Sequence, residues 1–537
     1  MTTQLDLATL FEAIAEALPE REALVWRGER RTFAETARRV RGLARVLHDH
    51  GLGRRGEPGD PWESHHDHLA LYLHNSPAYL EGLVGAHRAR VAPFNVNYRY
   101  VGDELEYLFA DARPKAILYH AVYAPTLASV LPNLAVRPLL LQVADESGNA
   151  LLPGALDYEE AIAAASDAPP DVTPDGDDLH ILYTGGTTGM PKGVLWRIAD
   201  LVDGPLGLRR RDGSRYASVA EAVEAAVNRT PVKTMVLPPM MHGAGTWTSL
   251  GGWLTGGTVL LPDVVSRLDM ENAVEIMERE GATRLPVVGD AFARPLVAEL
   301  ERRPRSLGLR QVVNSGAAIN PATKARLAEL LPGTRIIDIV GSSESGFQIT
   351  RQGGADTPFL ATPGTRVLSE DRTRLLEPGA DELGWLAKGG SIPLGYLGDP
   401  KKTAATFVRI GDFRCVIPGD RARLRADGFV EMHGRDSMTI NTGGEKVFAE
   451  EVEAVVRAVP GVAEALVLGR PSERWGNEIV AVVRVAEGSG LDDARLKEAC
   501  ASHLARYKIP KSFVVTDRDL RLPNGKADYA TARSLIQ

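Results

Sequence analysis

A short apolar strand that runs directly into a glycine- and threonine-rich loop constrains the fold of this chain more than any other feature. The strand pattern covers His180–Thr184, and the loop continues through Gly185–Lys192. Glycines let the backbone turn tightly, so the loop can present N–H groups, threonine hydroxyls and the Lys192 ammonium on a concave surface. Such a surface suits a polyphosphate. The spacing G-x-x-x-x-G-K-[ST] does not occur here, so the loop is not a Walker A loop.

Strand and helix patterns alternate along most of the chain, which predicts an α/β fold with a large, multi-sheet N-terminal domain. Leu69–Leu73 has the pattern of a strand, and Pro77–Arg88 that of the helix that follows it. Two polar segments, Gly53–His68 and Ala199–Thr230, have the character of insertions, and the second includes a helical stretch at Val219–Val227. Further buried strands are predicted at Val232–Leu237, Gly257–Leu261, Gln311–Val313 and Arg335–Val340.

The C-terminal part of the chain has a pattern of its own. After the polar turn Gly434-Arg435-Asp436, two helices and two alternating strands follow one another closely. The helices are expected at Glu450–Val459 and Asp492–Leu504, and the strands at Ala463–Leu468 and Ile479–Val485. This pattern predicts a large domain at residues 1–434 and a small α+β domain at residues 435–537.

The charge and the cysteines exclude several kinds of partner. A formal net charge of -8 provides no global basic field for nucleic acid. The only two cysteines, Cys415 and Cys500, argue against a disulfide framework and for a reducing compartment. Met1–Glu20 lacks a signal-peptide pattern, and no apolar run reaches the roughly 18 residues of a membrane span. We therefore expect a cytoplasmic protein without an integral membrane segment, and a homodimer is left open.

The string Ile181–Val194 resembles the phosphate-binding signature of the AMP-forming adenylating superfamily. That superfamily contains acyl-CoA synthetases, nonribosomal adenylation domains and firefly-type luciferases. The resemblance extends over nearly the whole chain, because the other motifs of the family follow in order. It implies that ATP phosphates are bound here, with Thr184 and Lys192 also serving catalysis. The implied phosphate-binding residues are Thr184, Gly185, Gly186, Thr187, Thr188, Gly189 and Lys192.

Two later motifs imply contacts with adenine, phosphate and metal. Asn314–Ala318 is similar to the segment that packs against adenine, and Gly341–Glu344 to the motif that touches phosphate through a serine or threonine. Its glutamate, Glu344, would be a catalytic ligand of Mg²⁺, for which a carboxylate is a suitable hard ligand. The family usually has an aromatic residue where this chain has Val340. The implied nucleotide-binding residues are Ser315, Gly316, Ala317, Ala318, Asp338, Gly341, Ser342 and Ser343.

The remaining nucleotide motifs lie towards the C-terminus. Asp420, in Pro418-Gly419-Asp420, corresponds to the aspartate that accepts hydrogen bonds from ribose, and Arg435 to the arginine that assists it. Lys526, in Pro523-Asn524-Gly525-Lys526, resembles the catalytic lysine of the family. Beside the carboxylate and the α-phosphate, its charge would stabilise the transition state and contact the nucleotide.

The resemblance also implies a mobile small domain. It would rotate about a hinge at Asp436 or Ser437, so that Lys526 leaves and the loop Thr442–Lys446 enters for the second half-reaction. The loop would then line the pantetheine tunnel of coenzyme A. The residues implied there are Gly443, Gly444, Glu445 and Lys446.

The motif Pro238–Gly243 resembles the segment that lines the acyl pocket of the family, so it is expected to contact the acid substrate. His242, Gly243 and Gly245 are the substrate-binding candidates, and the small residues nearby, with Gly251 and Gly252, suggest a roomy site. Three longer strings resemble an actinobacterial branch that includes synthetases for steroid side-chain acids: Leu182–Trp196, Gly341–Gly346 and Ile440–Phe448. We therefore expect a large hydrophobic acid, in the order steroid side-chain acid, medium- or long-chain fatty acid, aryl acid.

The resemblance implies an ATP-dependent acyl-CoA ligase that uses ATP, Mg²⁺, coenzyme A and a small carboxylic acid. An enzyme that loads an acyl group onto a separate carrier protein is the alternative. The chain itself contains no carrier domain and no carrier-type serine after Lys526. A non-catalytic binding homologue is a third reading, disfavoured because the main catalytic positions are filled.

Two other patterns suggest chemistry that their context does not support. Gly51–Gly56 fits G-x-G-x-x-G, but it follows a helical pattern and leads into Pro58, whereas a dinucleotide-binding turn needs a strand before and a helix after. His65, His66 and His68 could suggest a metal, but no second ligand cluster accompanies them, and a solvated loop is expected.

Overall fold

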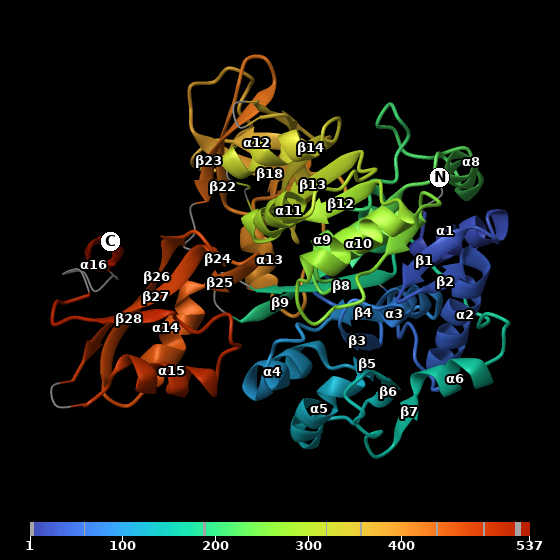
Figure 1. Cartoon of the computed structure of the whole chain (residues 1–537), viewed down its shortest axis with the longest axis horizontal. Helices are drawn as coiled ribbons and strands as arrows, with labels where there is room; N and C mark the ends of the chain where they lie inside the picture. Colours follow the sequence, from blue (N-terminus) through green and yellow to red (C-terminus); the bar gives the residue numbers. More distant parts are fainter. Residues whose placement is uncertain are drawn as a thin grey trace. The chain divides into compact units, whose positions relative to one another are not determined.

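The computed structural model describes residues 5–57, 59–185, 190–317, 319, 321–354, 357–435, 439–486, 489–520 and 528–536. The chain divides into two compact units (Figure 1). The first comprises Met1–Tyr98, Asp111–Tyr183 and Gly193–Gly434, and the second Arg99–Ala110, Thr184–Lys192 and Arg435–Gln537. Among the described residues, no helix has both the length and the apolar character needed to cross a bilayer.

Apart from the edge strand β2, which is antiparallel to β1, the largest sheet of the first unit is parallel over its first half and antiparallel over its second. From β1 to β14 each neighbouring strand is parallel, and β15 then turns back against β14. In spatial order the strands are β2 (Glu29–Thr32), β1 (Glu22–Trp26), β11 (Thr258–Leu260), β10 (Lys233–Met235), β12 (Arg284–Val287), β13 (Gln311–Ser315), β14 (Arg335–Ser342), β15 (Gly346–Gln352), β16 (Phe359–Ala361), β23 (Phe429–Arg435), β22 (Asp420–Leu424), β18 (Gly384–Gly389) with β17 (Thr365–Leu368) beside it, β21 (Phe413–Val416) and β20 (Phe407–Ile410).

A second sheet carries the glycine-rich loop between two of its strands, β8 and β9. The strands β8, β4, β3, β5, β6 and β7 run parallel to one another. Their spatial order is β19 (Gly395–Tyr396), β9 (Pro191–Arg197), β8 (Leu179–Gly185), β4 (Ala92–Asn95), β3 (His68–Tyr72), β5 (Ala116–His120), β6 (Leu139–Val143) and β7 (Ala155–Asp157). In open parallel sheets, ligands bind outside the carboxyl ends of the strands, and the predicted phosphate loop follows such an end.

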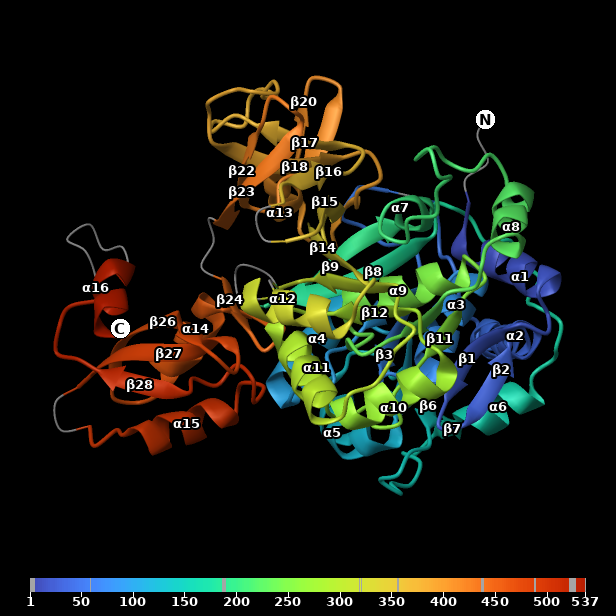
Figure 2. The same cartoon turned by 45° about the horizontal axis from the view of Figure 1, so that its top comes forward.

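Helices cover these sheets, as Figures 1 and 2 show. Capping residues mark the N-termini of several of these helices: Thr32 and Glu35 form a capping box at α2, and Asp269 caps α10. The helices of the first unit are α1 (Leu7–Ala17), α2 (Phe33–Asp49), α3 (Pro77–Arg88), α5 (Ala124–Val130), α6 (Tyr158–Ala164), α7 (Ile198–Asp203), α8 (Val219–Val227), α9 (Gly243–Trp253), α10 (Met270–Glu280), α11 (Asp290–Arg302), α12 (Pro321–Leu330) and α13 (Pro400–Thr406), with short 3₁₀ turns at Ala121–Tyr123 and Leu131–Asn133. Most of α4 (Gly102–Ala112) belongs to the second unit.

Large aromatic side chains pack in the core between α1, α2, α3 and α9. Phe11 packs against Phe33 and Trp253, with ring centroids 6.0 and 5.1 Å apart, and the Trp253 indole N–H donates to the Ala23 carbonyl at 2.8 Å. Such rings contribute a large apolar area to a core, and a buried indole needs a hydrogen-bond partner. This packing anchors α9, the helix that begins at the predicted acyl-pocket motif.

The second unit contains a small sheet with helices on both faces. Side chains alternate along β26, so that Ala465 and Val467 face the core with α14 and α15, whereas Leu466 and Leu468 face the core with α16. The strands are β25 (Glu445–Phe448), β24 (Thr439–Thr442), β27 (Gly476–Val485), β26 (Val462–Ser472) and β28 (Ser512–Val515), and the helices are α14 (Ala449–Ala458), α15 (Asp493–Ala501) and α16 (Tyr529–Leu535).

The predicted fold class, a large multi-sheet α/β part with a small α+β part, is confirmed. The helices at Pro77–Arg88 and Val219–Val227 have the predicted bounds, whereas α15 begins at Asp493 and ends at Ala501, three residues before the predicted Leu504. The strands β26 and β27 are both longer than predicted, because they pair with each other from Val462 to Ser472. Hairpin pairing lengthens strands beyond the segment that side-chain alternation marks.

Candidate active site

The turn between β14 and β15 presents the predicted metal-binding motif. Gly341 lies so close to the carbonyl oxygen of Gly346 that a Cβ atom would clash with it, so glycine is required there. The hydroxyl of Ser345 accepts a hydrogen bond from the Ser342 N–H at 3.1 Å, and the hydroxyl of Ser342 accepts one from the Glu344 N–H at 3.2 Å. These local bonds hold Ser342, Ser343 and Glu344 in one tight turn.

The half-buried carboxylate of Glu344 receives a single side-chain hydrogen bond. Tyr396 donates its hydroxyl to Oε1 at 3.1 Å, and within the described residues no hydrogen bond or ion pair reaches Oε2. An oxygen ligand that no cation neutralises fits a divalent hard ion. The described part of the chain holds no cluster of three or more His, Cys, Asp or Glu side chains arranged as a metal centre. Mg²⁺ commonly takes one or two carboxylates from a protein and further ligands from phosphates and water, so Glu344 fits it.

The predicted adenine segment follows the carboxyl end of β13. Asn314 donates to the Ala317 carbonyl at 3.0 Å and accepts from the Gly289 N–H at 2.8 Å, which ties the segment to the loop after β12. Gly316 has a φ of +76°, a conformation that favours glycine, and the half-buried Ser315 and Ala317 flank it. Ala318 lies outside the described residues. Asn314 was not among the predicted site residues, although it is part of the motif.

Asp338, predicted to contact nucleotide, is engaged by cations within the fold. Its carboxylate lies 2.6 Å from the Lys324 ammonium and 2.9 Å from the Arg351 guanidinium, and it accepts from Asn314 at 3.0 Å. Burial by itself would raise the pKa of Asp338, but these hydrogen bonds and charges outweigh burial and hold the pKa below its usual value. The carboxylate therefore stabilises the strand pair, and its nucleotide contact stays a prediction.

Two buried asparagines hold the predicted acyl-pocket motif. Asn75 donates to the Pro238 carbonyl at 3.0 Å and accepts from the Met240 N–H at 2.6 Å. Asn95 donates to the Met241 carbonyl at 2.7 Å and also bonds both the N–H and the carbonyl of Tyr183. The motif is thus tied to the carboxyl ends of β3, β4 and β8. Sequence reasoning missed both asparagines, because no local pattern marks them.

The half-buried His242 precedes α9 as its N-cap residue, and Gly243 and Gly245 form the first turn of that helix. A Cβ atom at Gly245 would lie 2.6 Å from the carbonyl oxygens of both Pro238 and Pro239. One at Gly251 would lie 3.1 Å from the Leu206 carbonyl oxygen, whereas Gly252 has open space at that position. Close packing therefore explains the small residue at Gly245, and it leaves little room for a side chain at Gly251. These two glycines have a packing reason of their own, and the roomy acyl pocket stays a prediction.

The described ends of the phosphate loop lie on strands. Thr184 and Gly185 end β8, and Lys192 lies near the start of β9; Thr184 and Lys192 are half-buried. Asp420 begins β22 and is buried, and Arg435 ends β23. Several predicted site residues lie outside the described residues, namely Gly186, Thr187, Thr188, Gly189, Asp436, Ser437 and Lys526.

In the second unit, the predicted coenzyme A loop is a β-hairpin turn. Gly443 and Gly444 connect β24 to β25 with φ values of +57° and +85°. Two successive positive φ values are typical of a two-residue hairpin turn, which explains both glycines by backbone geometry. Glu445 is buried and accepts a hydrogen bond from Arg99, and Lys446, the next residue, is half-buried. Contact of these residues with coenzyme A stays a prediction.

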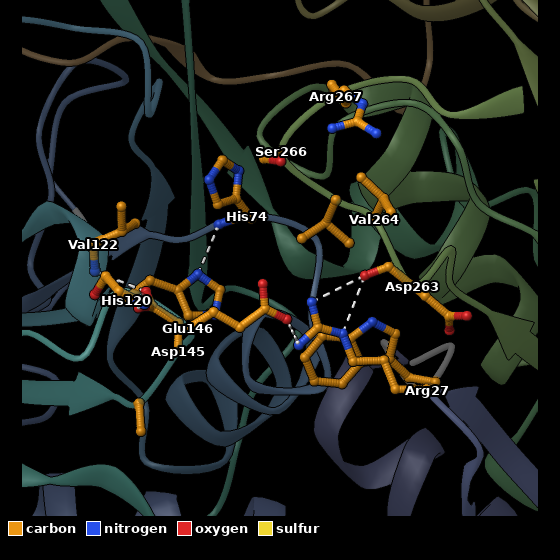
Figure 3. A pocket seen from close by; sticks show the side chains of 14 residues that line it. Arg27, His74, His120, Val122, Asp145, Glu146, Asp263, Val264, Ser266 and Arg267 are labelled. Carbon is orange, nitrogen blue, oxygen red and sulfur yellow. Dashed lines mark hydrogen bonds and ion pairs between the residues drawn. The ribbon is translucent and has the colours of Figure 1, made fainter. Parts of the chain in front are cut away.

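A pocket of about 660 Å³ lies elsewhere in the first unit, at the carboxyl ends of β3, β5, β6 and β11 (Figure 3). Glu146 and Arg27 form an ion pair of 2.7 Å at its wall, and His120 accepts from the His74 N–H at 3.0 Å. Burial, assisted by His74, lowers the pKa of His120 to about 3, so this imidazole is neutral. None of the sequence-predicted site residues lines this pocket.

The histidine-rich segment before β3 is structural. His66 is buried and lies 3.1 Å from Asp178, and His68 is buried with Nε2 2.8 Å from the Ser64 hydroxyl. The expected solvated loop was therefore wrong for these two histidines. Both cysteines are buried, and burial raises the pKa of each thiol to about 11, which disfavours the nucleophilic thiolate.

Comparison with known proteins agrees with the order of the motifs. The AMP-binding enzyme family model matches residues 11–391, and the AMP-binding enzyme C-terminal domain matches residues 451–526. The medium-chain acyl-CoA ligase Mig of Mycobacterium avium is 47% identical over 99% of this chain and 98% of its own. The medium/long-chain-fatty-acid–CoA/3-oxocholest-4-en-26-oate–CoA ligase of Mycobacterium marinum is 37% identical over 99% of this chain and 97% of its own. The structure of the amide bond synthetase McbA from Marinactinospora thermotolerans, 20% identical, has the same fold, with a TM-score of 0.79 over 99% of both chains.

Proposed function

Because this chain belongs to the AMP-binding enzyme family, we propose that it is an AMP-forming acid–CoA ligase. A carboxylate oxygen attacks the α-phosphorus of ATP, pyrophosphate leaves, and an acyl-adenylate forms. The sulfur of coenzyme A then attacks the acyl carbonyl carbon, and AMP leaves. The observation that carries this proposal is the 47% identity, over 99% of the chain, to a relative named as an acyl-CoA ligase.

The described residues are suited to parts of this reaction. Glu344 would hold Mg²⁺, which, when bound, supplies neutralisation of the phosphate charge. Ser342 and Ser343 lie in the same turn and can donate hydroxyl groups to phosphate. Asn314 and Gly316 shape the segment proposed to lie against adenine, and Asp420 is proposed to bind the ribose hydroxyls. The phosphate loop, with Thr184, Thr187, Thr188 and Lys192, is proposed to bind the β- and γ-phosphates.

The domain assignment and the residues of the small domain are part of the same proposal. We assign residues 1–434 to the large domain and 435–537 to the small one. Lys526 would act in adenylation only, and rotation about Asp436 or Ser437 would bring the loop of Gly443–Lys446 into place for thioester formation. We also propose a cytoplasmic location, which the nature of the proposed substrates and the two free cysteines support.

For the acid, we propose a medium-chain fatty acid ahead of a steroid side-chain acid. This order reverses the expectation from the sequence strings, because the relative named for medium-chain acids is 47% identical and the relative whose name includes a steroid acid is 37% identical. It is also compatible with the packing role of Gly245 and Gly251, which removes one argument for an unusually roomy pocket. Transfer to a separate carrier protein is the second candidate.

The test is pyrophosphate release by the purified protein with ATP, Mg²⁺ and a panel of acids, with and without coenzyme A. We expect turnover only when acid and coenzyme A are both present, an acyl-CoA product by mass spectrometry, and the highest kcat/KM for medium-chain acids. Acyl-AMP that accumulates without any acyl-CoA would indicate a carrier-loading enzyme. Absence of acid-dependent pyrophosphate release would contradict the proposal. Light scattering of the same sample would report whether the enzyme is a homodimer.

A further inference from the structure

Tyr396 lies next to the predicted metal ligand although it belongs to none of the sequence motifs considered above. It is the second residue of β19, and its side chain is almost fully buried. Its hydroxyl donates to Oε1 of Glu344 at 3.1 Å. The two residues are separated by 52 positions in the chain, so that only the folded structure brings them together.

Several independent contacts fix the position of the Tyr396 ring. β19 pairs with β9, with Tyr396 opposite Val194, and the Tyr396 N–H donates to the Thr403 hydroxyl at 2.9 Å. The ring meets Phe407 edge to face, with centroids 5.7 Å apart. The Lys402 ammonium lies 4.7 Å from the centroid of the same ring. A phenol held in this way has little rotamer freedom and gives its hydroxyl a fixed direction.

The strand β9 supports the same turn from a second side chain. Trp196, which is fully buried, donates its indole N–H to the carbonyl of Ser343 at 2.9 Å. The strand pair β9–β19 therefore provides two donors to two consecutive residues, one to the backbone of Ser343 and one to the side chain of Glu344. Backbone and carboxylate of the motif are fixed by the same rigid element.

The kind of donor matters as much as its position. Asp338, on the strand that leads to this turn, is neutralised by Lys324 and Arg351. Glu344 is instead held by a neutral hydroxyl, which orients a carboxylate without cancelling its charge. One oxygen is occupied, and Oε2 is left without a hydrogen bond among the described residues. The second carboxylate oxygen is thus left to bind a cation.

We infer that Tyr396 is the positioning residue of Glu344, and that its hydroxyl orients this carboxylate towards the metal ion of a bound metal–nucleotide complex. The inference rests on the proposed function, because it assumes that Glu344 is the metal ligand. Partners that orient metal-binding carboxylates typically contribute 10- to 100-fold to metal affinity or activity, by an order-of-magnitude rule. Removing this hydroxyl is therefore expected to weaken metal binding by about tenfold.

The test is Tyr396→Phe in the full-length enzyme, which removes only the hydroxyl. Mn²⁺ binding is measured by electron paramagnetic resonance in the presence of a non-hydrolysable ATP analogue, and nucleotide binding is measured separately in EDTA. We expect the Mn²⁺ dissociation constant to rise about tenfold, with metal-free nucleotide affinity unchanged. Tyr119→Phe is the matched control: Tyr119, on β5 of the same sheet, is also buried, and its hydroxyl donates to Gln142 on the neighbouring β6 at 2.8 Å. It should leave Mn²⁺ binding at the wild-type value.

A double-mutant cycle with Glu344→Gln decides whether Tyr396 acts through Glu344. Tyr396→Phe should have no further effect on Mn²⁺ binding when Glu344 is already Gln. An unchanged dissociation constant in the single variant, or an equal loss in both backgrounds, would overturn the inference. If the wild type bound no Mn²⁺–nucleotide, the proposed function itself would fail. That outcome is distinguishable, because it is measured before any variant is made.

Discussion

The ammonium of Lys508 lies 2.6 Å from Oε1 of Glu451 in the interior of the second unit, and both side chains are buried. A second carboxylate, that of Glu104, lies 2.6 Å from the same ammonium. The Tyr100 ring covers the lysine, with its centroid 4.9 Å from Nζ. One cation therefore holds two buried carboxylates from distant parts of the sequence.

Lys508→Met should strongly destabilise the second unit. The variant leaves two buried carboxylates without a cation, and breaking a buried pair typically costs about 3–5 kcal/mol. Lys497→Met, which removes an exposed pair with Asp493, is the control and should change the unfolding free energy by less than about 1 kcal/mol. Scanning calorimetry of the full chain measures both. Equal changes in the unfolding free energy of the two variants would show that the buried cluster stabilises the protein no more than the exposed pair does.

Glu451 should make stability depend on pH. Burial, opposed by Lys508, raises the pKa of this carboxyl from 4.5 to about 7. Between these pH values the folded protein holds a proton that the unfolded chain releases, so the stabilisation is present below pH 4.5 and is lost as the pH rises through 7. The melting temperature of the wild type relative to Glu451→Gln should therefore fall from pH 4.5 to pH 8. The exposed Glu498→Gln serves as control, and its profile should run parallel to the wild type.

Replacing the carboxylate of Asp338 by an amide should lower the stability of the fold, whereas the same replacement at Glu344 should affect the dependence on Mg²⁺. Asp338→Asn leaves the buried Lys324 without its carboxylate partner, which should cost about 3 kcal/mol or more of stability. Glu344→Gln breaks no ion pair among the described residues and should change stability by less than about 1 kcal/mol. It should instead raise the Mg²⁺ concentration needed for half-maximal turnover. Melting curves and Mg²⁺ titrations on both variants provide the measurement. A larger stability loss in Glu344→Gln than in Asp338→Asn would contradict the prediction.

Two glycines of α9 offer a test of the pocket. Gly245→Ala places a methyl group 2.6 Å from two carbonyl oxygens, and such overpacking typically costs about 1–3 kcal/mol. It should also raise KM for the acid, because Pro238 and Pro239 belong to the predicted acyl-pocket motif. Gly252→Ala meets open space and should stabilise the helix by up to about 1 kcal/mol. If both variants behaved alike, the close contact at Gly245 would not be the cause.

Lys526 lies outside the described residues, and its role is tested by chemistry. Lys526→Ala should slow acyl-AMP formation by orders of magnitude, because the charge that stabilises the transition state is lost. Thioester formation from supplied acyl-AMP should largely survive, since the lysine is proposed to leave the site before that step. Single-turnover measurements of each half-reaction provide the comparison. Equal loss in both would argue against rotation of the small domain.

The sequence alone determined the features that depend on neighbouring residues. The run of glycines and threonines before Lys192, and the order of the motifs up to Lys526, were enough to identify the family. Alternating and helical patterns placed β26, β27 and α3, because local periodicity reflects which side chains face a core. Gly443 and Gly444 were noticed as a pair, and the two-residue hairpin turn supplies the backbone reason.

Only the tertiary structure decided which distant groups meet. Tyr396 reaches Glu344, Asn95 reaches Met241, and Lys508 joins Glu104 to Glu451 across hundreds of positions. His66 was expected in solvent, but Asp178, 112 positions away, gives it a buried partner. No local pattern encodes such contacts, because they depend on how strands order themselves in a sheet and which strand ends become neighbours. The family could therefore be identified from the sequence, whereas the residues that support the proposed metal-binding carboxylate come together only in the folded structure.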